Sequence, residues 1–206
     1  MNATSFKLAV ILACAAIGSG CGEVARQGRS PSQIVINNLQ AAAGGAQTFS
    51  GVLQSDVITR AQEDDPASCT IFNDSGQVTM SIVLKDQGTP ATASSPTPLN
   101  QVTFTRYRVV YRRTDRTDGG MPGTDVPFPF ESAVTFTVPE TGQATAGFNL
   151  VRQTAKLEAP LLALRRSAVL LSMIADVTFI GRDLAGNDVI ATGSIGITFG
   201  DFGGGC

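Results

Sequence analysis

Residues 171–199, LSMIADVTFIGRDLAGNDVIATGSIGITF, contain two runs in which apolar residues occupy every second position. A period of two places one apolar row on a single face of a β-strand. The runs are joined by residues 182–188, which are rich in Asp, Asn and Gly and so tolerate left-handed or Asx-turn backbone. The stretch predicts a long β-hairpin, which we expect to be the most stable element. Its two rows are Leu171, Met173, Ala175, Val177 and Phe179, and Val189, Ala191, Gly193, Ile195, Ile197 and Phe199.

The same alternation predicts strands earlier in the chain. One clear apolar row consists of Val78, Met80, Ile82 and Leu84. Two more runs, at 134–138 and 146–150, flank the turn residues 140–143. We expect these two runs to form neighbouring antiparallel strands.

Two further segments are candidate strands, at 33–41 and 51–59. The first also fits a helix capped by Ser30 or Ser32, because Leu and Ala residues at its end favour helix. We prefer a strand there, since residues 34–36 are all β-branched.

Residues 102–113, VTFTRYRVVYRR, break simple alternation. One extra residue at Arg106 restores a single apolar face, which predicts a β-bulge. That face consists of Val102, Phe104, Tyr107, Val109 and Tyr111. The opposite face carries Thr103, Thr105, Arg108, Val110 and Arg112, and Arg113 continues the basic stripe into the turn.

The strand pattern and composition together indicate the fold class. About eight short strands, without intervening helical periods, predict an all-β protein. We expect an antiparallel two-sheet β-sandwich, immunoglobulin-like or related, formed as a single domain by residues 33–206. With 206 residues, 43% of them hydrophobic and 16% charged, the chain is suited to one folded domain rather than to a disordered one.

The first residues have the features of an export signal. Lys7 precedes a ten-residue apolar or small stretch, 8–17, which is about half the length that a membrane-spanning helix needs. Residues 1–20 are therefore predicted to be a signal peptide. Residues 21–32 lack apolar periodicity and are expected to form a flexible tether.

Gly18-Ser19-Gly20-Cys21 resembles the lipobox of bacterial lipoproteins. The resemblance implies that Cys21 is acylated and becomes the new N-terminus. The protein would then lie in the cell envelope, attached to a membrane by its lipid on the periplasmic or cell-surface side. The alternative is an ordinary secretion signal cut near Gly20, which leaves Cys21 as a thiol.

Composition argues against several kinds of chemistry. The chain has no histidine, so it lacks the usual general base of serine and cysteine hydrolases and the commonest metal ligand. A net charge of −2 gives no long-range attraction to nucleic acid.

Asp201-Phe202-Gly203 has the sequence of a kinase motif, but the other kinase motifs do not accompany it. We interpret it as the end of the last strand. We expect a non-enzymatic protein without a cofactor, although two carboxylates distant in sequence remain an alternative for glycoside hydrolysis.

Cysteine usage predicts a covalent link. Once the signal peptide is removed and Cys21 is acylated, Cys69 and Cys206 are the two remaining thiols. Paired cysteines persist outside the cytoplasm, so we expect a Cys69–Cys206 disulfide. The alternative is two unpaired cysteines.

Two groups of charged residues are candidate binding sites. Arg106, Arg108, Arg112 and Arg113 fit an anionic polysaccharide, a phosphate-rich lipid or an acidic partner, since guanidinium groups bind carboxylate and phosphate in pairs of hydrogen bonds. A solvated strand face or edge also explains them, and we prefer it because exposed charge on a strand needs no further cause. Asp115, Asp118 and Asp125 are calcium candidates, but their spacing does not match an EF-hand loop, and a solvated hairpin loop also explains them.

The sequence therefore favours a non-enzymatic, lipid-anchored envelope protein whose sandwich has a structural or protein-interaction role. The second hypothesis is a ligand-binding module for carbohydrate, an anionic polymer or calcium. Expected partners are the membrane and an envelope protein or glycan, with no role for nucleic acid.

Overall fold

The computed structural model of the chain describes residues 28–60 and 68–202. The predicted signal peptide, Cys21 and Cys206 lie outside these ranges. Eight strands form two main sheets, which confirms the predicted all-β sandwich. The first sheet has the order β1 (Ser32–Ala42), β5 (Asp74–Leu84) and β10 (Ala144–Val151). The second has the order β2 (Val52–Asp56), β12 (Asp188–Gly200), β11 (Leu171–Asp183), β8 (Val102–Arg113) and β9 (Phe130–Val138).

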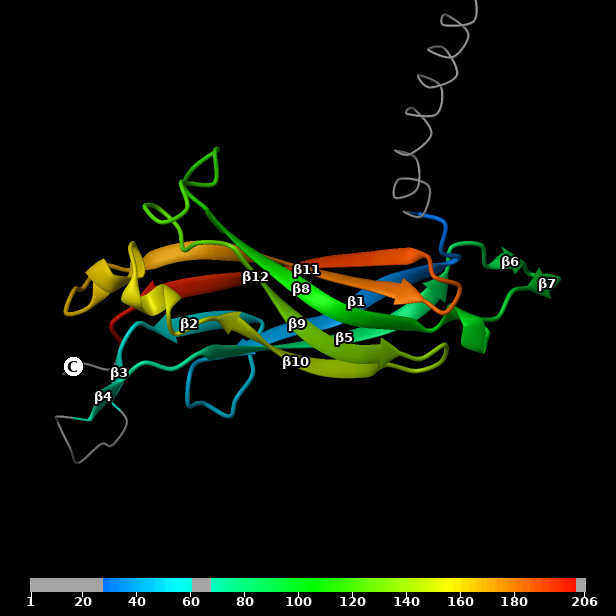
Figure 1. Cartoon of the computed structure of the whole chain (residues 1–206), viewed down its shortest axis with the longest axis horizontal. Coiled ribbons are helices and arrows are strands. Elements are labelled where there is room, and N and C mark those ends of the chain that lie inside the picture. The colour runs from blue at the N-terminus through cyan, green and yellow to red at the C-terminus, as the bar shows by residue number, and fades with distance from the viewer. Residues whose placement is uncertain (1–27, 61–67, 203–206) are drawn as a thin grey trace, which may run out of the picture.

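Short elements complete the ends of the sandwich. The paired strands are β3 (Thr59–Arg60) with β4 (Cys69–Thr70), and β6 (Gly88–Thr89) with β7 (Thr92–Ala93). The 3-10 turns are η1 (Pro98–Asn100), η2 (Ala155–Leu157) and η3 (Leu161–Leu164). Figure 1 shows an elongated molecule whose long strands follow its longest axis.

The predicted C-terminal hairpin is confirmed. β11 pairs with β12 in one unbroken antiparallel register, from Leu171 opposite Phe199 to Arg182 opposite Asp188. Asp183 organises the turn, because its carboxylate accepts hydrogen bonds from the backbone N–H and the side-chain amide of Asn187. These bonds keep the pKa of Asp183 below its usual value despite the opposing effect of burial.

The predicted β-bulge in 102–113 is present, but one residue before the predicted position, Arg106. The β8–β11 register passes from Phe104 opposite Gly181 to Arg106 opposite Ile180, so Thr105 is the extra residue. The apolar face inferred from this bulge is buried along its length. A Cβ atom on Gly181 would lie 2.4 Å from the carbonyl oxygen of Thr103. Glycine at this position therefore lets the bulged strand approach its neighbour closely.

The runs at 134–138 and 146–150 form strands, but they are not paired neighbours as predicted. β9 pairs with β8 in the second sheet, whereas β10 pairs with β5 in the first. An alternating strand needs only to bury its apolar row. Two such strands achieve this by facing each other across the sandwich as well as by lying side by side.

Segment 33–41 is a strand, as preferred, and belongs to β1, which pairs antiparallel with β5. Residues after β1 cross to the other sheet, where β2 pairs with β12 in parallel. The expectation of purely antiparallel sheets is wrong at this one edge.

The strand order is that of an immunoglobulin-like sandwich. β1, β5 and β10 occupy the places of strands A, B and E, and β8, β11 and β12 occupy those of C, F and G.

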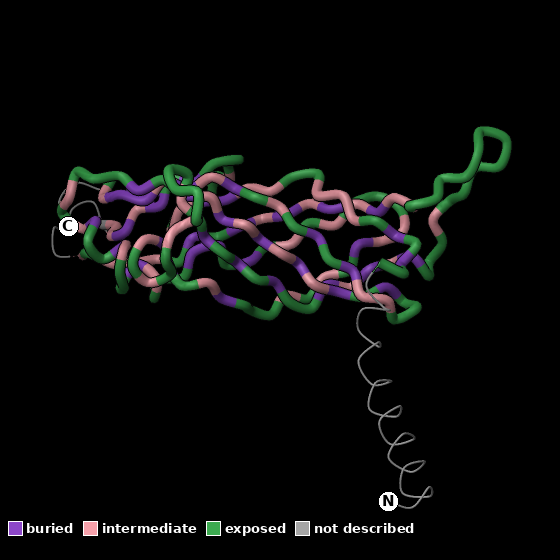
Figure 2. Tube along the Cα trace, turned by 90° about the horizontal axis from the view of Figure 1, so that it is seen from above, coloured by how far each residue is buried: buried purple, intermediate pink, exposed green. Residues whose placement is uncertain are grey.

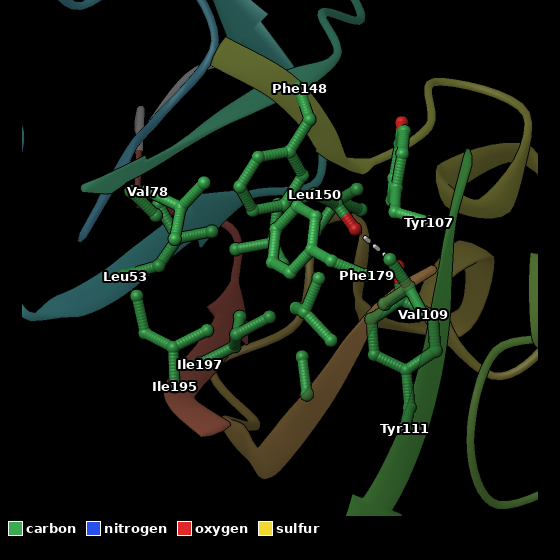
Figure 3. Packing of buried hydrophobic residues seen from close by; sticks show 14 of the residues in the cluster. Leu53, Val78, Tyr107, Val109, Tyr111, Phe148, Leu150, Phe179, Ile195 and Ile197 are labelled. Carbon is green, nitrogen blue, oxygen red and sulfur yellow. Dashed lines mark hydrogen bonds between the residues drawn. The ribbon is translucent and has the colours of Figure 1, made fainter. Parts of the chain in front are cut away.

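The core lies between the sheets and is centred on aromatic rings. The ring of Phe179 on β11 lies 5.3 Å from that of Phe148 on β10 and 6.2 Å from those of Phe104, Tyr107 and Phe136. Figure 3 shows Phe179 between Phe148 and Tyr107, close to Leu150. Buried positions recur along the whole length of the strands (Figure 2). The two sheets are therefore held together along one continuous hydrophobic core.

Candidate functional site

Arg106, Arg108 and Arg112 are exposed on the outer face of β8, whereas Arg113, at the end of the strand, is partly buried opposite Met173. Only part of this arginine stripe is unpaired. Arg112 Nε donates to Asp176 Oδ2 at 2.8 Å, and Arg113 forms a two-point ion pair with Asp115. Arg106 and Arg108 are exposed and make no ion pair with any residue that the structure describes. The four predicted residues thus divide into a surface pair that is already neutralised and a pair that is free to bind an anion.

A shallow groove of about 590 Å³ begins beside Arg106. Its walls come from the bulged part of β8 and from the end of the β11–β12 hairpin. Thr103 and Thr105 supply hydroxyl groups, and Arg182 lines the groove while paired with Asp188 at 2.7 Å. The groove combines hydroxyl groups with one unpaired guanidinium group.

The acidic loop between β8 and β9 uses its carboxylates internally. Asp125 accepts hydrogen bonds from Arg116 and from the backbone N–H of Met121, and Asp118 accepts one from the N–H of Gly120. The hydrogen bond from Arg113 lowers the pKa of Asp115. Among the described residues, no three His, Cys, Asp or Glu side chains lie together as a metal site would require. The calcium hypothesis stays a prediction and gains no support from this loop.

Of the two cysteines in the predicted disulfide, the structure describes only Cys69. Cys69 begins β4 and lies opposite Arg60 of β3, whereas Cys206 lies outside the described residues. The end of β12 approaches the same region, because Val57 N–H donates to Gly200 O at 3.0 Å and Phe202 N–H donates to Asp56 Oδ1 at 3.2 Å. The pairing stays a prediction, as does acylation of Cys21.

The most concentrated group of polar side chains was not found from the sequence. Asp74, the first residue of β5, is fully buried, and so are Lys156 of η2 and Ser55 of β2. Lys156 Nζ donates to Asp74 Oδ1 at 2.8 Å, and the N–H of Gly44 donates to the same oxygen at 2.8 Å. Ser55 Oγ donates to Asp74 Oδ2 at 2.6 Å. These contacts join segments up to 82 residues apart in the chain.

This buried group lies beside other ionisable residues. Burial raises the pKa of Tyr111, and the charge of Asp74 adds to that effect. The Tyr111 hydroxyl donates to the carbonyl of Leu150 at 2.7 Å (Figure 3). Burial also raises the pKa of Asp56, although the N–H groups of Phe202 and Ile58 oppose the shift. Burial therefore favours the neutral form of both Tyr111 and Asp56.

No sequence motif marks the buried group. Asp74 follows a loop and precedes an alternating strand, which is typical of a solvated residue at a strand start. Lys156 is one of few charges in an apolar stretch of η2 and η3, where Leu161 and Leu164 are buried. This apolar stretch is the sequence feature that could have indicated a buried ion pair, since a lysine among buried leucines requires a partner. Only the fold identifies the partner.

Exposed apolar side chains gather at one end of the sandwich. This distal end is formed by the 114–129 loop, the 152–170 segment and the end of β12, which lie together at the left of Figure 1. Residues 28–31 lie toward the opposite end, where Lys85 Nζ donates to Gly28 O. The distal exposed residues are Met121, Phe128, Leu157, Leu162, Val169, Leu170 and Phe202. Such a concentration is typical of an interaction surface.

Comparisons with known proteins do not assign this chain to a family. No protein-family model, no curated protein and no solved structure matches the chain. In residues 28–60 and 68–202, no helix has the length and hydrophobicity to cross a membrane.

Proposed function

We propose that this protein is an exported, lipid-anchored, non-enzymatic envelope protein whose β-sandwich binds a partner protein through its distal end. The observation that supports this function best is the separation of the two ends. Seven large apolar side chains are exposed at the distal end, while residues 28–31, the last part of the proposed tether before β1, lie toward the other. An anchor at Cys21 would therefore direct the distal surface away from the membrane.

The distal surface has the composition of a binding surface. Leu170 and Phe202 lie beside each other over Gly200, where an added Cβ would come within 2.5 Å of the Leu170 side chain. Arg152 stacks on the ring of Phe130, 4.3 Å from its centre, at the start of the strand that follows the 114–129 loop. Apolar residues beside an arginine and an aromatic ring are enriched in protein interfaces.

The binding proposal is tested by site-specific photocrosslinking in intact cells. A photoreactive phenylalanine replaces Leu162 at the distal end. The matched control replaces Leu184 in the β11–β12 turn, which is 60% exposed against 45% for Leu162. We expect one adduct of defined mass from position 162, none from 184, and loss of that adduct when Val169→Asp is added.

Equal adducts from both positions, or none from 162, would contradict a distal binding surface. Circular dichroism of each variant verifies that the sandwich is folded. Anchoring is tested separately by the mass of the mature N-terminus and by Cys21→Ser. We expect a diacylated cysteine in the parent protein and its absence in the variant. A soluble parent protein with an unmodified N-terminus would overturn the anchor and leave the binding proposal intact.

A second candidate function is supported by the groove beside Arg106. Arg106 and two threonine hydroxyls line the groove, and exposed Arg108 follows on the same strand outside it. This arrangement suits an extended anionic polysaccharide, which offers carboxylate or sulfate together with hydroxyl groups. Heparin is a suitable probe. Arg106→Ser with Arg108→Ser should abolish salt-sensitive retention on a heparin column, whereas Arg112→Ser, which removes an arginine paired with Asp176, should not.

A further inference from the structure

The buried contact between Asp74 and Lys156 has no role in the proposed binding surface. The side chains of both residues are shielded from solvent, with exposures of 0% and 1%. Removing a carboxylate and an ammonium from water costs several kcal/mol for each ion, and their attraction repays this only in part. The fold therefore holds two groups together at a cost that a neutral product would relieve.

The amine of Lys156 and the carboxyl group of Asp74 lie close enough to react with each other. Lys156 Nζ is 2.8 Å from Asp74 Oδ1, which leaves it roughly 3 to 4 Å from the carboxyl carbon, since a C–O bond is about 1.2 Å long. The lower part of this range is the separation of about 3–3.5 Å at which reacting atoms lie in a well-oriented intramolecular reaction. Because η2 and β5 are fixed by the core, no conformational search separates the amine from the carboxyl group.

Both carboxyl oxygens also have donors where amide formation needs them. The backbone N–H of Gly44 donates to Oδ1 and stabilises the charge that develops there during attack. The hydroxyl of Ser55 contacts Oδ2 and can relay a proton to it. Gly44 is held in place by close packing, since a Cβ atom there would lie 2.1 Å from Phe72 Cβ.

We propose that Lys156 and Asp74 condense to an intramolecular isopeptide bond. The ammonium group transfers one proton to the carboxylate, and the free amine attacks the carboxyl carbon to form a C–N bond. A second proton leaves the nitrogen for Oδ2, the C–Oδ2 bond breaks, and one water molecule is released. Oδ1 becomes the amide oxygen and the nitrogen keeps one hydrogen. The step needs no oxidant, cofactor or other protein, and it converts two buried charges into a neutral amide.

The bond would link the first strand residue of β5 to η2, on the crossover between β10 and β11. It would close the distal end of the core independently of the predicted Cys69–Cys206 disulfide. The proposal is also independent of what the distal surface binds, since Asp74, Lys156 and the neighbouring Ser55 are all buried.

Peptide mapping of the intact mature protein, purified from the cells that export it, tests the bond directly. After reduction and alkylation, trypsin would give linear peptides 61–85 and 153–156 if Asp74 and Lys156 are unlinked. With the isopeptide bond, cleavage after Lys156 is blocked. We expect one branched peptide that joins 61–85 to 153–165 and weighs one water molecule less than their sum. Fragmentation should locate the link at Asp74 and Lys156.

Lys156→Arg is the matched control, because arginine keeps the positive charge and the ion pair but does not form this amide. That variant should give only linear peptides. Recovery of linear 61–85 and 153–156 in full yield from the parent protein would overturn the proposal, and so would a loss of water located at any other residue. Both results are read from the unsubstituted protein, so they do not depend on the folding of a variant.

Discussion

The ring of Phe179 on β11 meets the ring of Phe148 on β10 edge to face, with centres 5.3 Å apart and planes inclined by 87°. The two rings belong to different sheets, so this contact joins the halves of the sandwich at the middle of the core.

Phe179→Ala should lower the free energy of unfolding by about 3–5 kcal/mol, because it removes a fully buried ring that contacts four other rings. Urea denaturation followed by circular dichroism provides the measurement. Ile190→Ala, at a position 52% exposed on β12, should cost under about 1 kcal/mol. Similar losses for the two variants would show that the aromatic cluster is not the centre of the core.

Gly181→Ala should destabilise the protein by about 1–3 kcal/mol, because the new methyl group would overlap the backbone of Thr103 and Phe104. Gly196→Ala on β12 is the control, since its methyl group would meet only Val52 at 3.9 Å. Thermal unfolding of both variants distinguishes a specific clash at the bulge from a general cost of changing strand glycines. Equal melting temperatures would contradict the close approach of β8 and β11.

Asp56→Asn should stabilise the protein at neutral pH. Burial raises the pKa of Asp56 in the folded state above its ordinary value of 3.8. The folded state therefore binds this proton more readily than the unfolded state, so the contribution of Asp56 to stability falls as the pH rises between the two pKa values. Asparagine carries no charge and still offers an oxygen to the N–H groups of Phe202 and Ile58.

The gain in melting temperature of Asp56→Asn should shrink as the pH is lowered toward 4 and should be largest near pH 7. Asp115→Asn is a useful contrast, since Arg113 lowers the pKa of that carboxyl group and the sign of the pH dependence is reversed. A constant difference between Asp56→Asn and the parent protein at all pH values would contradict the shift.

Alkylation with a thiol reagent should label Cys69 and Cys206 only after reduction. Phe202 is bound to Asp56, close to the β3–β4 pair that contains Cys69. The four residues that follow reach at most about 14 Å when extended. Cys206→Ser should lower the melting temperature, because the long loop between the two cysteines would no longer be closed. Labelling of both thiols without reduction would contradict the disulfide.

The strands could be predicted because most of them show alternating apolar residues within their own sequence. Alternation in 171–199 identifies the hairpin, and the defect in alternation near Arg106 identifies the bulge. Pairing between β9 and β10 was predicted incorrectly, since a period of two specifies a buried face but not the strand that lies beside it.

The buried Asp74–Lys156 contact could not be predicted from the sequence for a different reason. Each residue has an ordinary local sequence, and their proximity depends on how two distant segments cross the same end of the core. Arg108 and Arg112 were located correctly on an outer face, but sequence did not reveal which arginines are paired. Asp176, the partner of Arg112, lies 64 residues away on β11.

The long axis also has a mechanical consequence. Tension applied between Gly28 and the distal end would act along the strands of both sheets. β1 is the first long element to bear that tension, and ten of its residues are in register with β5. Their hydrogen bonds would be loaded together in shear and could not be peeled apart one by one. A molecule fixed at one end and held at the other would therefore resist pulling in the direction in which its sheets are strongest.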